Sequence, residues 1–232
     1  MKTILSIIIP VYNEENNIYK VIDSIKKIHL PNVEKEIIIV DDGSWDGTSG
    51  ILKKYHGDSE IQIHFSRLNF GKGVATRIGL TYATGDIVLI QDADLEYDIN
   101  DYPKLIQPII ENKADVVYGS RFKGKIRNMA LFNYLGNKIL SWLASILFMR
   151  HITDEATAFK VFRASTIKSI NLTCKRYELC PELTAKLLKD RSVRYAEVPI
   201  SYIGRSIAEG KKIKLRDGVT AIWTLIKYRI FK

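Results

Sequence analysis

The chain contains the stretch Asp86-Ile87-Val88-Leu89-Ile90-Gln91-Asp92-Ala93-Asp94-Leu95-Glu96, an apolar run followed at once by carboxylates. The apolar part is typical of a strand buried on both faces of a parallel sheet. Side chains of an extended backbone alternate with a period of two, so Asp92 and Asp94 point to the same side. Two carboxylates at the exit of a buried strand suit a hard cation such as Mg²⁺ or Mn²⁺, which usually completes its shell with substrate phosphates.

Strand and helix patterns alternate through the first half of the chain. Strands are expected at residues 4–11, 36–41, 61–65, 86–91 and 115–118, and helices at 16–28, 48–55, 72–83 and 102–112. This alternation predicts an α/β fold, with a Rossmann-like, mainly parallel sheet and helices on both faces. In such sheets ligands bind at the carboxyl ends of the strands, which is where the polar clusters of this sequence fall.

The second half has a looser pattern. Helices are expected at residues 131–149, 181–189 and 215–231, strands at 158–163 and 194–198, and a loop at 204–210. No repeat, low-complexity stretch or linker separates the halves, so a single domain over residues 1–232 is expected.

The composition limits the kinds of partner. The net charge of +9 and the pI near 9.4 indicate an anionic partner, such as phosphorylated substrates, a membrane surface or nucleic acid. No nucleic-acid recognition motif is present. The two cysteines have neither zinc-site spacing nor the number for a disulfide framework, which favours a reducing cytoplasm. Pro10 and an acidic pair interrupt the apolar N-terminus, and no apolar run reaches the roughly 20 residues of a spanning helix.

Three further motifs have both a functional and a purely structural interpretation. Asp42, in Asp41-Asp42-Gly43-Ser44, either binds the base or ribose of a nucleotide or belongs to a simple strand-to-helix turn. Lys72, in Asn69-Phe70-Gly71-Lys72-Gly73, either contacts a phosphate at a helix N-terminus or is an exposed lysine. The spacing of an NTPase phosphate loop is absent. Arg121, after an expected strand end, either clamps a phosphate or forms a surface salt bridge.

Taken in order, these motifs resemble the family 2 glycosyltransferases. The matching stretches, from residue 4 to 122, are Ser6 to Glu15, Val40 to Thr48, Asn69 to Gly73, Ala83 to Asp86 and Asp92 to Leu95. Gly119-Ser120-Arg121-Phe122, the stretch from Thr153 to Arg163 and the stretch from Gly204 to Gly218 resemble the dolichol-phosphate mannosyltransferase-like branch. Members of that branch move a sugar from a nucleotide diphosphate onto a polyprenyl phosphate.

The resemblance implies a GT-A fold, an inverting reaction and a divalent metal, Mg²⁺ or Mn²⁺. By motif position the metal ligands are Asp92 and Asp94, with Glu96 as a further ligand where the branch often has glutamine. The nucleotide site is lined by Pro10, Tyr12, Glu14 and Asp42, and Lys72 is expected to bind the nucleotide sugar through a phosphate. Arg121 is expected to meet the acceptor phosphate, and Arg205 and Lys211 to close over the diphosphate. Asp154 is expected to act as a base or a positioning group, with a helix or turn cap as the structural alternative.

The same resemblance divides the chain into functional parts. Residues 1–122 form the nucleotide-sugar half, residues 123–210 the acceptor half, and residues 211–232 an amphipathic, membrane-proximal helix. Two departures concern the acceptor and the sugar: Ala156 stands where the branch has an acidic residue, with Glu155 displaced by one, and Cys180 stands where it often has an acid.

The expected function is therefore metal-dependent sugar transfer from a UDP- or GDP-linked donor to a dolichyl or undecaprenyl phosphate. Two alternatives remain open: a family 2 enzyme with a saccharide acceptor, and a non-catalytic membrane scaffold that binds a nucleotide sugar. Loss of metal-dependent turnover would favour the scaffold.

The last helix suggests how a lipid acceptor is reached. One face is expected to carry Leu215, Val219, Ile222, Trp223, Ile226 and Ile230, with basic residues at its flanks. Such a helix suits an anionic membrane surface, although most amphipathic helices pack on a core. The expected location is cytoplasmic, peripheral at the inner face of the membrane, directly or through a homo-oligomer or a small membrane subunit.

Overall fold

The structure of the chain is a computed structural model that describes residues 2–205 and 215–231, with the Leu215 side chain left out. Lys211 and most of the loop expected at 204–210 lie outside the described residues. No described helix has both the length and the apolar character needed to cross a bilayer.

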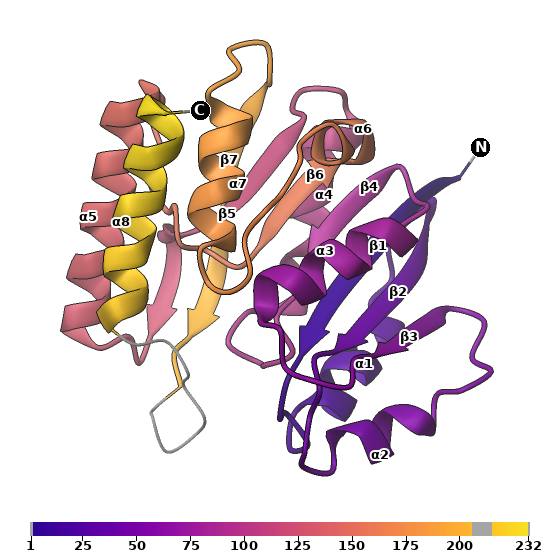
Figure 1. Cartoon of the computed structure of the whole chain (residues 1–232). Helices are drawn as coiled ribbons and strands as arrows, with labels where there is room; N and C mark the ends of the chain where they lie inside the picture. Colours follow the sequence, from indigo (N-terminus) through magenta and orange to yellow (C-terminus); the bar gives the residue numbers. More distant parts are fainter. Residues whose placement is uncertain (1, 206–214, 232) are drawn as a thin grey trace.

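Seven strands form one sheet in the order β3-β2-β1-β4-β6-β5-β7 (Figure 1). The strands are β1 (Thr3–Val11), β2 (Val33–Asp41), β3 (Ile61–Phe65), β4 (Ile87–Ile90), β5 (Val116–Arg127), β6 (Lys160–Arg163) and β7 (Tyr195–Ile203). All neighbouring pairs are parallel except those of β6, which runs antiparallel to both β4 and β5. The expected α/β fold with a mainly parallel sheet is confirmed.

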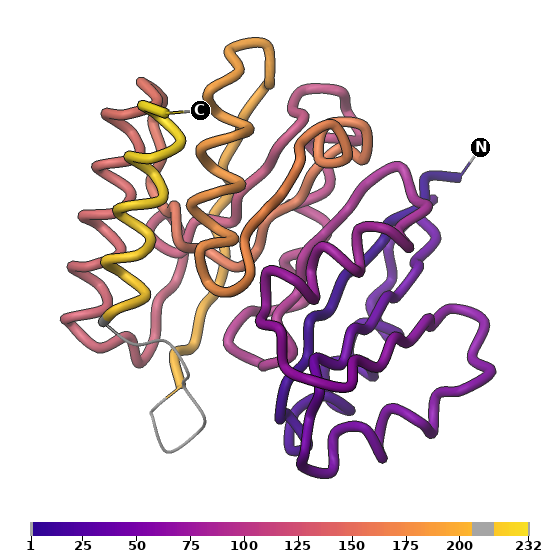
Figure 2. The backbone as a smooth tube through the Cα atoms, viewed as in Figure 1, coloured from indigo at the N-terminus to yellow at the C-terminus, as the bar shows by residue number. Residues whose placement is uncertain are grey.

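Helices cover both faces of the sheet. The face covered by α1 (Ile18–Lys27), α2 (Thr48–Lys53) and α4 (Tyr102–Ile110) holds one apolar core, and η1 (Ile99–Asp101) leads into α4. The other core lies under α3 (Lys72–Tyr82), α5 (Leu131–Phe148), α6 (Ala164–Lys168), α7 (Leu179–Leu188) and α8 (Leu215–Ile230). Strand alternation makes both cores, since Ile7 and Ile9 face the first and Ile8 the second. Figure 2 shows α8 beside α5, at the side of the molecule away from β1 to β3.

One expectation about β5 is wrong. Arg121 was expected after a strand end, but β5 continues to Arg127, so Arg121 lies inside the strand. The pairing of β5 with β7 changes register between Ser120 and Lys125. Such a bulge inserts residues and re-aims nearby side chains. Gly124 makes the close approach possible, because a Cβ atom there would lie 1.9 Å from the carbonyl oxygen of Ile200.

Two glycines bring separate loops together at the carboxyl edge of the sheet. Gly43 has φ +71°, and a Cβ atom there would lie 2.5 Å from the backbone of Leu68. Gly71 has φ +101°, and its Cβ atom would lie 2.4 Å from the carbonyl oxygen of Lys175. A side chain would be strained at both positions and would separate the loops.

Glu182 connects α7 to α8 and to the loop that packs on Gly71. Its side chain is 1% exposed, and its carboxylate accepts hydrogen bonds from the Tyr228 hydroxyl of α8 (2.7 Å) and from the Thr173 and Cys174 amides (2.9 and 2.6 Å). Lys186 completes the set at 2.6 Å. Burial opposes ionisation, but these donors outweigh it and lower the pKa of Glu182 to about 2.

We predict that Glu182→Gln destabilises the fold in a pH-dependent way. Because the folded pKa lies below the ordinary value of 4.5, the stabilisation is present above pH 4.5 and is lost as the pH falls toward 2. The shift corresponds to about 3 kcal/mol at neutral pH. Urea unfolding at pH 7 and pH 3 measures it: the variant is less stable than wild type at pH 7, and the gap narrows at pH 3.

The matched control is Glu34→Gln, because Glu34 is a surface carboxylate in an exposed ion pair with Lys2. Its unfolding free energy stays within about 0.5 kcal/mol of wild type at both pH values. If Glu182→Gln were as stable as wild type at pH 7, the ionised Glu182 carboxylate would not stabilise the fold.

Candidate functional site

Carboxylates gather at the carboxyl ends of β1, β2 and β4. Glu14 follows β1, Asp42 follows β2, and Asp92 and Asp94 follow β4. These strands are neighbours in the sheet, so their ends meet along one edge. The sequence-predicted nucleotide and metal residues of the first half are therefore brought together.

The ends of β1 and β2 are joined by side chain to backbone hydrogen bonds. Asn13 adopts φ 50°, its side-chain oxygen accepts from the Trp45 amide (3.0 Å), and its amide donates to Ser44 Oγ (2.9 Å). The Glu14 amide donates to Thr48 Oγ1 at 2.9 Å. The two loops thus form one rigid floor. Two other predicted lining residues lie nearby in the sequence: Pro10, within β1, is buried, and Tyr12, just after β1, is partly exposed.

Asp42 holds the start of α3 against β2. Its carboxylate accepts the amides of Phe70 (2.9 Å) and Gly71 (2.7 Å), and the residue is 3% exposed. Burial raises the pKa of Asp42, although both amides act against this. The Asp42 side chain thus fixes the loop that precedes Lys72. This contact was not among the two roles predicted for Asp42, nucleotide binding or a strand-to-helix turn.

Lys72 opens α3 and forms an ion pair with Asp92 across the edge. Both side chains are about one-fifth exposed. Lys72 is therefore a partly buried partner of Asp92, which differs from both predicted roles, a phosphate contact and an exposed surface lysine. Burial lowers the pKa of Lys72, but the charge of Asp92 outweighs it and the pKa rises above its ordinary value. The Lys72 ammonium therefore neutralises Asp92, one of the three predicted metal ligands.

Arg205 neutralises the other carboxylates. Its Nη2 lies 2.6 Å from Asp94, its Nη1 3.2 Å from Glu14 and its Nε 3.4 Å from Glu96. Asp94 is 8% exposed, and burial, followed by the charges of Asp92 and Glu96, raises its pKa to about 7. Arg205 thus lies among three acidic side chains from two separate parts of the sequence, Glu14 after β1 and the pair Asp94 and Glu96 after β4.

The oxygen donors suit a hard divalent cation, with one difference from the predicted ligand set. Within residues 2–205 and 215–231, no three acidic, histidine or cysteine side chains converge as a metal site. Glu96 turns to the Tyr202 hydroxyl (2.8 Å) and the Arg205 amide (3.0 Å). Asp92 and Asp94 fit the pattern of Mg²⁺, which uses one or two carboxylates together with substrate phosphates.

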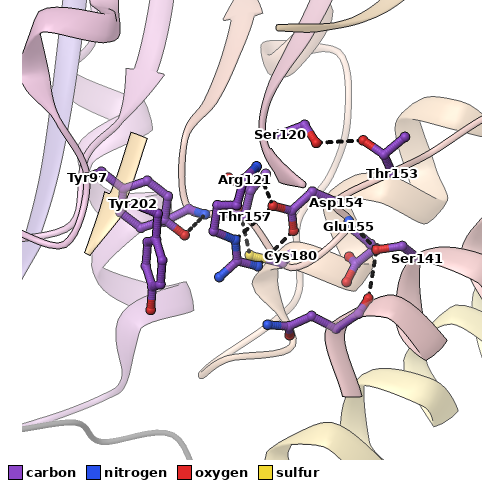
Figure 3. A network of polar contacts seen from close by, with 12 residues as sticks. Tyr97, Ser120, Arg121, Ser141, Thr153, Asp154, Glu155, Thr157, Cys180 and Tyr202 are labelled. Atoms are coloured by element: carbon purple, nitrogen blue, oxygen red, sulfur yellow. Dashed lines mark hydrogen bonds and ion pairs between the residues drawn. The ribbon is translucent and has the colours of Figure 1, made fainter. Parts of the chain in front are cut away.

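Arg121 and Asp154 form a second, buried unit (Figure 3). Arg121 donates from Nε and Nη2 to the two Asp154 oxygens, each at 2.7 Å, and from its amide at 2.9 Å. Asp154 is fully buried and Arg121 is 5% exposed. Among the described residues, Arg121 Nη1 has no hydrogen-bond partner. The ion pair is bidentate, which gives it a fixed geometry. Because it is buried, the structural alternative for Arg121, a salt bridge at the surface, is wrong.

Tyr202 lies between the carboxylate cluster and Arg121. Its hydroxyl donates to Glu96 at 2.8 Å, and the Arg121 guanidinium lies over its ring at 5.1 Å from the centroid. This distance is within the range of a cation–π contact. A single aromatic side chain therefore separates the predicted donor site from the predicted acceptor arginine.

Glu155, one position before Ala156, where the sequence departs from the branch pattern, is a core residue. It is fully buried, and its carboxylate accepts from Thr184 Oγ1 at 3.1 Å. Its backbone amide donates to Ser141 Oγ at 2.9 Å (Figure 3). Burial raises its pKa. Its backbone carbonyl accepts from Lys160, whose Nζ lies 3.6 Å from the centre of the Tyr118 ring. Glu155 is thus a core residue.

Two residues of this region were missed by the sequence reasoning, Tyr202 and Glu197. Both lie on β7, which extends to Ile203 rather than ending near residue 198. The available signal was an acidic residue between Ala196 and Val198 in an otherwise apolar strand. A carboxylate at such a position is costly unless it is hydrogen-bonded.

Comparison with known proteins gives the chain a family. The model of the family described as Glycosyl transferase family 2 matches residues 6–170. A UDP-N-acetylglucosamine–dolichyl-phosphate N-acetylglucosaminyltransferase of Methanococcus voltae is 34% identical over 91% of both chains. A dolichol-phosphate mannosyltransferase of Pyrococcus furiosus is 29% identical over 89% of this chain and 58% of its own length.

A solved structure has the same fold. Glucosyl-3-phosphoglycerate synthase of Mycobacterium tuberculosis, crystallised with Mn²⁺, uridine diphosphate and phosphoglyceric acid, superimposes with a TM-score of 0.76. The match covers 99% of this chain and 80% of that one, at 20% identity. The expected GT-A fold and the resemblance drawn from the motifs are confirmed, and the chain belongs to glycosyl transferase family 2.

Proposed function

We propose that this chain transfers a sugar, with inversion, from a UDP- or GDP-linked donor to a polyprenyl phosphate in a metal-dependent reaction. Two relatives carry names of transferases that act on dolichyl or dolichol phosphate, and one of them matches over 91% of both chains. The solved structure with Mn²⁺ and uridine diphosphate supports a nucleotide and a divalent cation.

The observation that carries the acceptor assignment is the geometry around Tyr202. Arg121 is locked by Asp154, retains a donor at Nη1, and lies one aromatic ring from the carboxylate cluster. A guanidinium held in this way is suited to a phosphate oxygen. A phosphate bound there would lie next to a sugar whose diphosphate is held at Asp92 and Asp94.

The donor half supplies the groups that bind and orient the nucleotide sugar. Pro10, Tyr12 and Glu14 lie beside the floor formed by the ends of β1 and β2, and Asp42 fixes the loop before Lys72. Asp92 and Asp94 would hold a divalent ion, which supplies positive charge where the departing diphosphate develops negative charge. Lys72 and Arg205 then become available to the phosphates, with Lys211 as a further contact.

The acceptor chemistry requires little base catalysis. The second pKa of a phosphate monoester is near 6, so it is largely dianionic at neutral pH. Both oxygens of Asp154 are engaged by Arg121, and the side chain is fully buried. Of the two roles expected for Asp154, positioning fits this geometry better than proton abstraction.

Contact with the membrane is assigned to α5 and α8. Apolar side chains on both helices are more than half exposed, namely Leu131, Phe132, Leu135, Ile139, Trp142 and Ile146 on α5 and Val219, Trp223 and Ile230 on α8. The core-facing side of α8 is instead formed by Ala221, Leu225 and Tyr228. Apolar and aromatic groups with nearby cations suit the surface of an anionic bilayer, here proposed as the inner face of the membrane.

We predict product from one donor of a panel of UDP- and GDP-sugars with a short polyprenyl phosphate and Mn²⁺ or Mg²⁺. Asp94→Ala loses at least about 100-fold in turnover, because it removes charge stabilisation of the leaving diphosphate. EDTA abolishes product. The control is Asp23→Ala, which removes a surface carboxylate of α1 paired with Lys27 and keeps wild-type turnover. Donor binding without transfer to the lipid phosphate would contradict the proposed acceptor.

We also predict that the exposed tryptophans of α5 and α8 bind anionic vesicles. Each buried aromatic side chain contributes roughly 1–3 kcal/mol, so the double variant Trp142→Ser, Trp223→Ser weakens vesicle binding at least about tenfold. Co-sedimentation with vesicles containing an anionic lipid measures this. Trp45, which is 79% exposed beside α2, provides the control, and Trp45→Ser binds like wild type. Equal binding by the double variant would exclude this face.

A further inference from the structure

Glu197 is a buried carboxylate that no part of the proposed reaction uses directly. It lies on β7, and its side chain is 1% exposed. The carboxylate accepts hydrogen bonds from five groups: the Thr153 amide (2.7 Å), Thr153 Oγ1 (2.6 Å), the Asp154 amide (3.3 Å), the Tyr195 hydroxyl (2.8 Å) and Lys123 Nζ (2.9 Å). Burial opposes its ionisation, but these donors keep its pKa below the ordinary value.

The hydrogen bonds around Glu197 have a fixed direction. A carboxylate only accepts, so the single proton of the Thr153 hydroxyl is donated to Glu197. Thr153 Oγ1 must then accept from Ser120 Oγ, 2.6 Å away. Ser120 directly precedes Arg121 in β5. Two successive hydrogen bonds, from Ser120 to Thr153 and from Thr153 to Glu197, therefore connect β5, which carries Arg121, to β7.

A second connection runs through Asp154. Glu197 holds the amides of Thr153 and Asp154, and Asp154 in turn holds the amide and guanidinium of Arg121. No other carboxylate in the described part of the chain accepts hydrogen bonds from the Thr153 or Asp154 amide. Ser120, which precedes Arg121, and Asp154, which pairs with its guanidinium, are thus both held in position through the Glu197 carboxylate.

We propose that Glu197 is a positioning residue that fixes the orientation of Arg121 toward the acceptor phosphate through Thr153 and Asp154. This inference rests on the proposed function. Within the described residues, Glu197 makes no hydrogen bond or ion pair to the donor-side carboxylates, to Lys72 or to Arg205, although Arg205 follows the same strand, β7. Loss of the Glu197 carboxylate should therefore weaken binding and turnover of the acceptor phosphate and leave nucleotide binding unchanged.

The test uses Glu197→Gln in the full chain. The side-chain amide of glutamine has an NH2 group, which would face N–H and O–H groups that already donate to Glu197. The segment at Thr153 and Asp154 would therefore lose its fixed position. The expected result is a 10- to 100-fold loss of kcat/KM for a short polyprenyl phosphate, a range typical of groups that orient a functional residue. The Kd for uridine or guanosine diphosphate with Mn²⁺ changes less than twofold.

Asp115→Asn is the matched control. Asp115 accepts from Arg163 and Arg194 at the opposite end of β5, so its loss weakens the same pair of strands without touching Arg121. It should lower the melting temperature and leave acceptor kcat/KM unchanged. Thr153→Val is a second variant, which removes the hydroxyl link and keeps Glu197 paired with Lys123. It should lose at least fivefold in acceptor kcat/KM even if Glu197→Gln does not fold.

Hydrogen exchange separates this inference from the proposed function. In Glu197→Gln the amides of Arg121, Thr153 and Asp154 should exchange at least tenfold faster, and in Asp115→Asn they should not. Failure of the wild-type protein to transfer sugar overturns the proposed acceptor but leaves this exchange result to decide whether Glu197 holds Arg121. Unchanged exchange, or folded variants with acceptor kcat/KM within threefold of wild type, overturns the positioning role.

Discussion

The arrangement of this molecule depends on how it neutralises the carboxylates that parallel strands deliver to one edge of the sheet. Glu14 follows β1, and Asp92 and Asp94 follow β4, so partly buried negative charges repel one another along this edge. Opposite charges about 4 Å apart attract by about 4 kcal/mol at an effective dielectric constant near 20. Lys72 and Arg205 provide this attraction, Lys72 at Asp92 and Arg205 at Asp94, Glu14 and Glu96. The edge is thus held together by two cations from distant parts of the chain.

The same pairs suit the proposed reaction. Donor phosphates and a divalent ion bring their own opposite charges, so the carboxylates can exchange Arg205 and Lys72 for the ion while the two cations turn to the phosphates. The surrounding structure stays fixed, because Asp42 and Glu182 hold the loops at the start of α3 from both sides. On the acceptor side, Glu197 and Asp154 hold Arg121 in the same manner. In the proposed reaction Tyr202 therefore separates two exchangeable cations at the donor site from the fixed guanidinium of Arg121 at the acceptor site.

Much of the fold could be predicted from the sequence, because buried parallel strands leave continuous apolar runs and their polar ends mark the ligand edge. The positions of Asp42, Asp92, Asp94 and Glu14 followed from that pattern. The length of β5 did not, because the bulge near Gly124 depends on contact with Ile200 of a distant strand. The partners of Arg121 and Glu197 were also out of reach, since hydrogen bonds between residues more than 30 positions apart leave no periodic signal.

We infer that the metal site is completed only when a donor diphosphate and a divalent ion bind together, so that the ion replaces Lys72 and Arg205 beside Asp92 and Asp94. Titration of Mn²⁺ by electron paramagnetic resonance, with and without uridine or guanosine diphosphate, tests it most directly. We expect weak Mn²⁺ binding alone and at least about tenfold tighter binding with one of the two nucleotides, since Mg²⁺-like ions rely on substrate phosphates. Arg205→Gln should bind Mn²⁺ alone more tightly than wild type, because Asp94 loses a competing cation. Tight Mn²⁺ binding that neither nucleotide nor Arg205→Gln changes would show that Asp92 and Asp94 form a complete metal site without the donor.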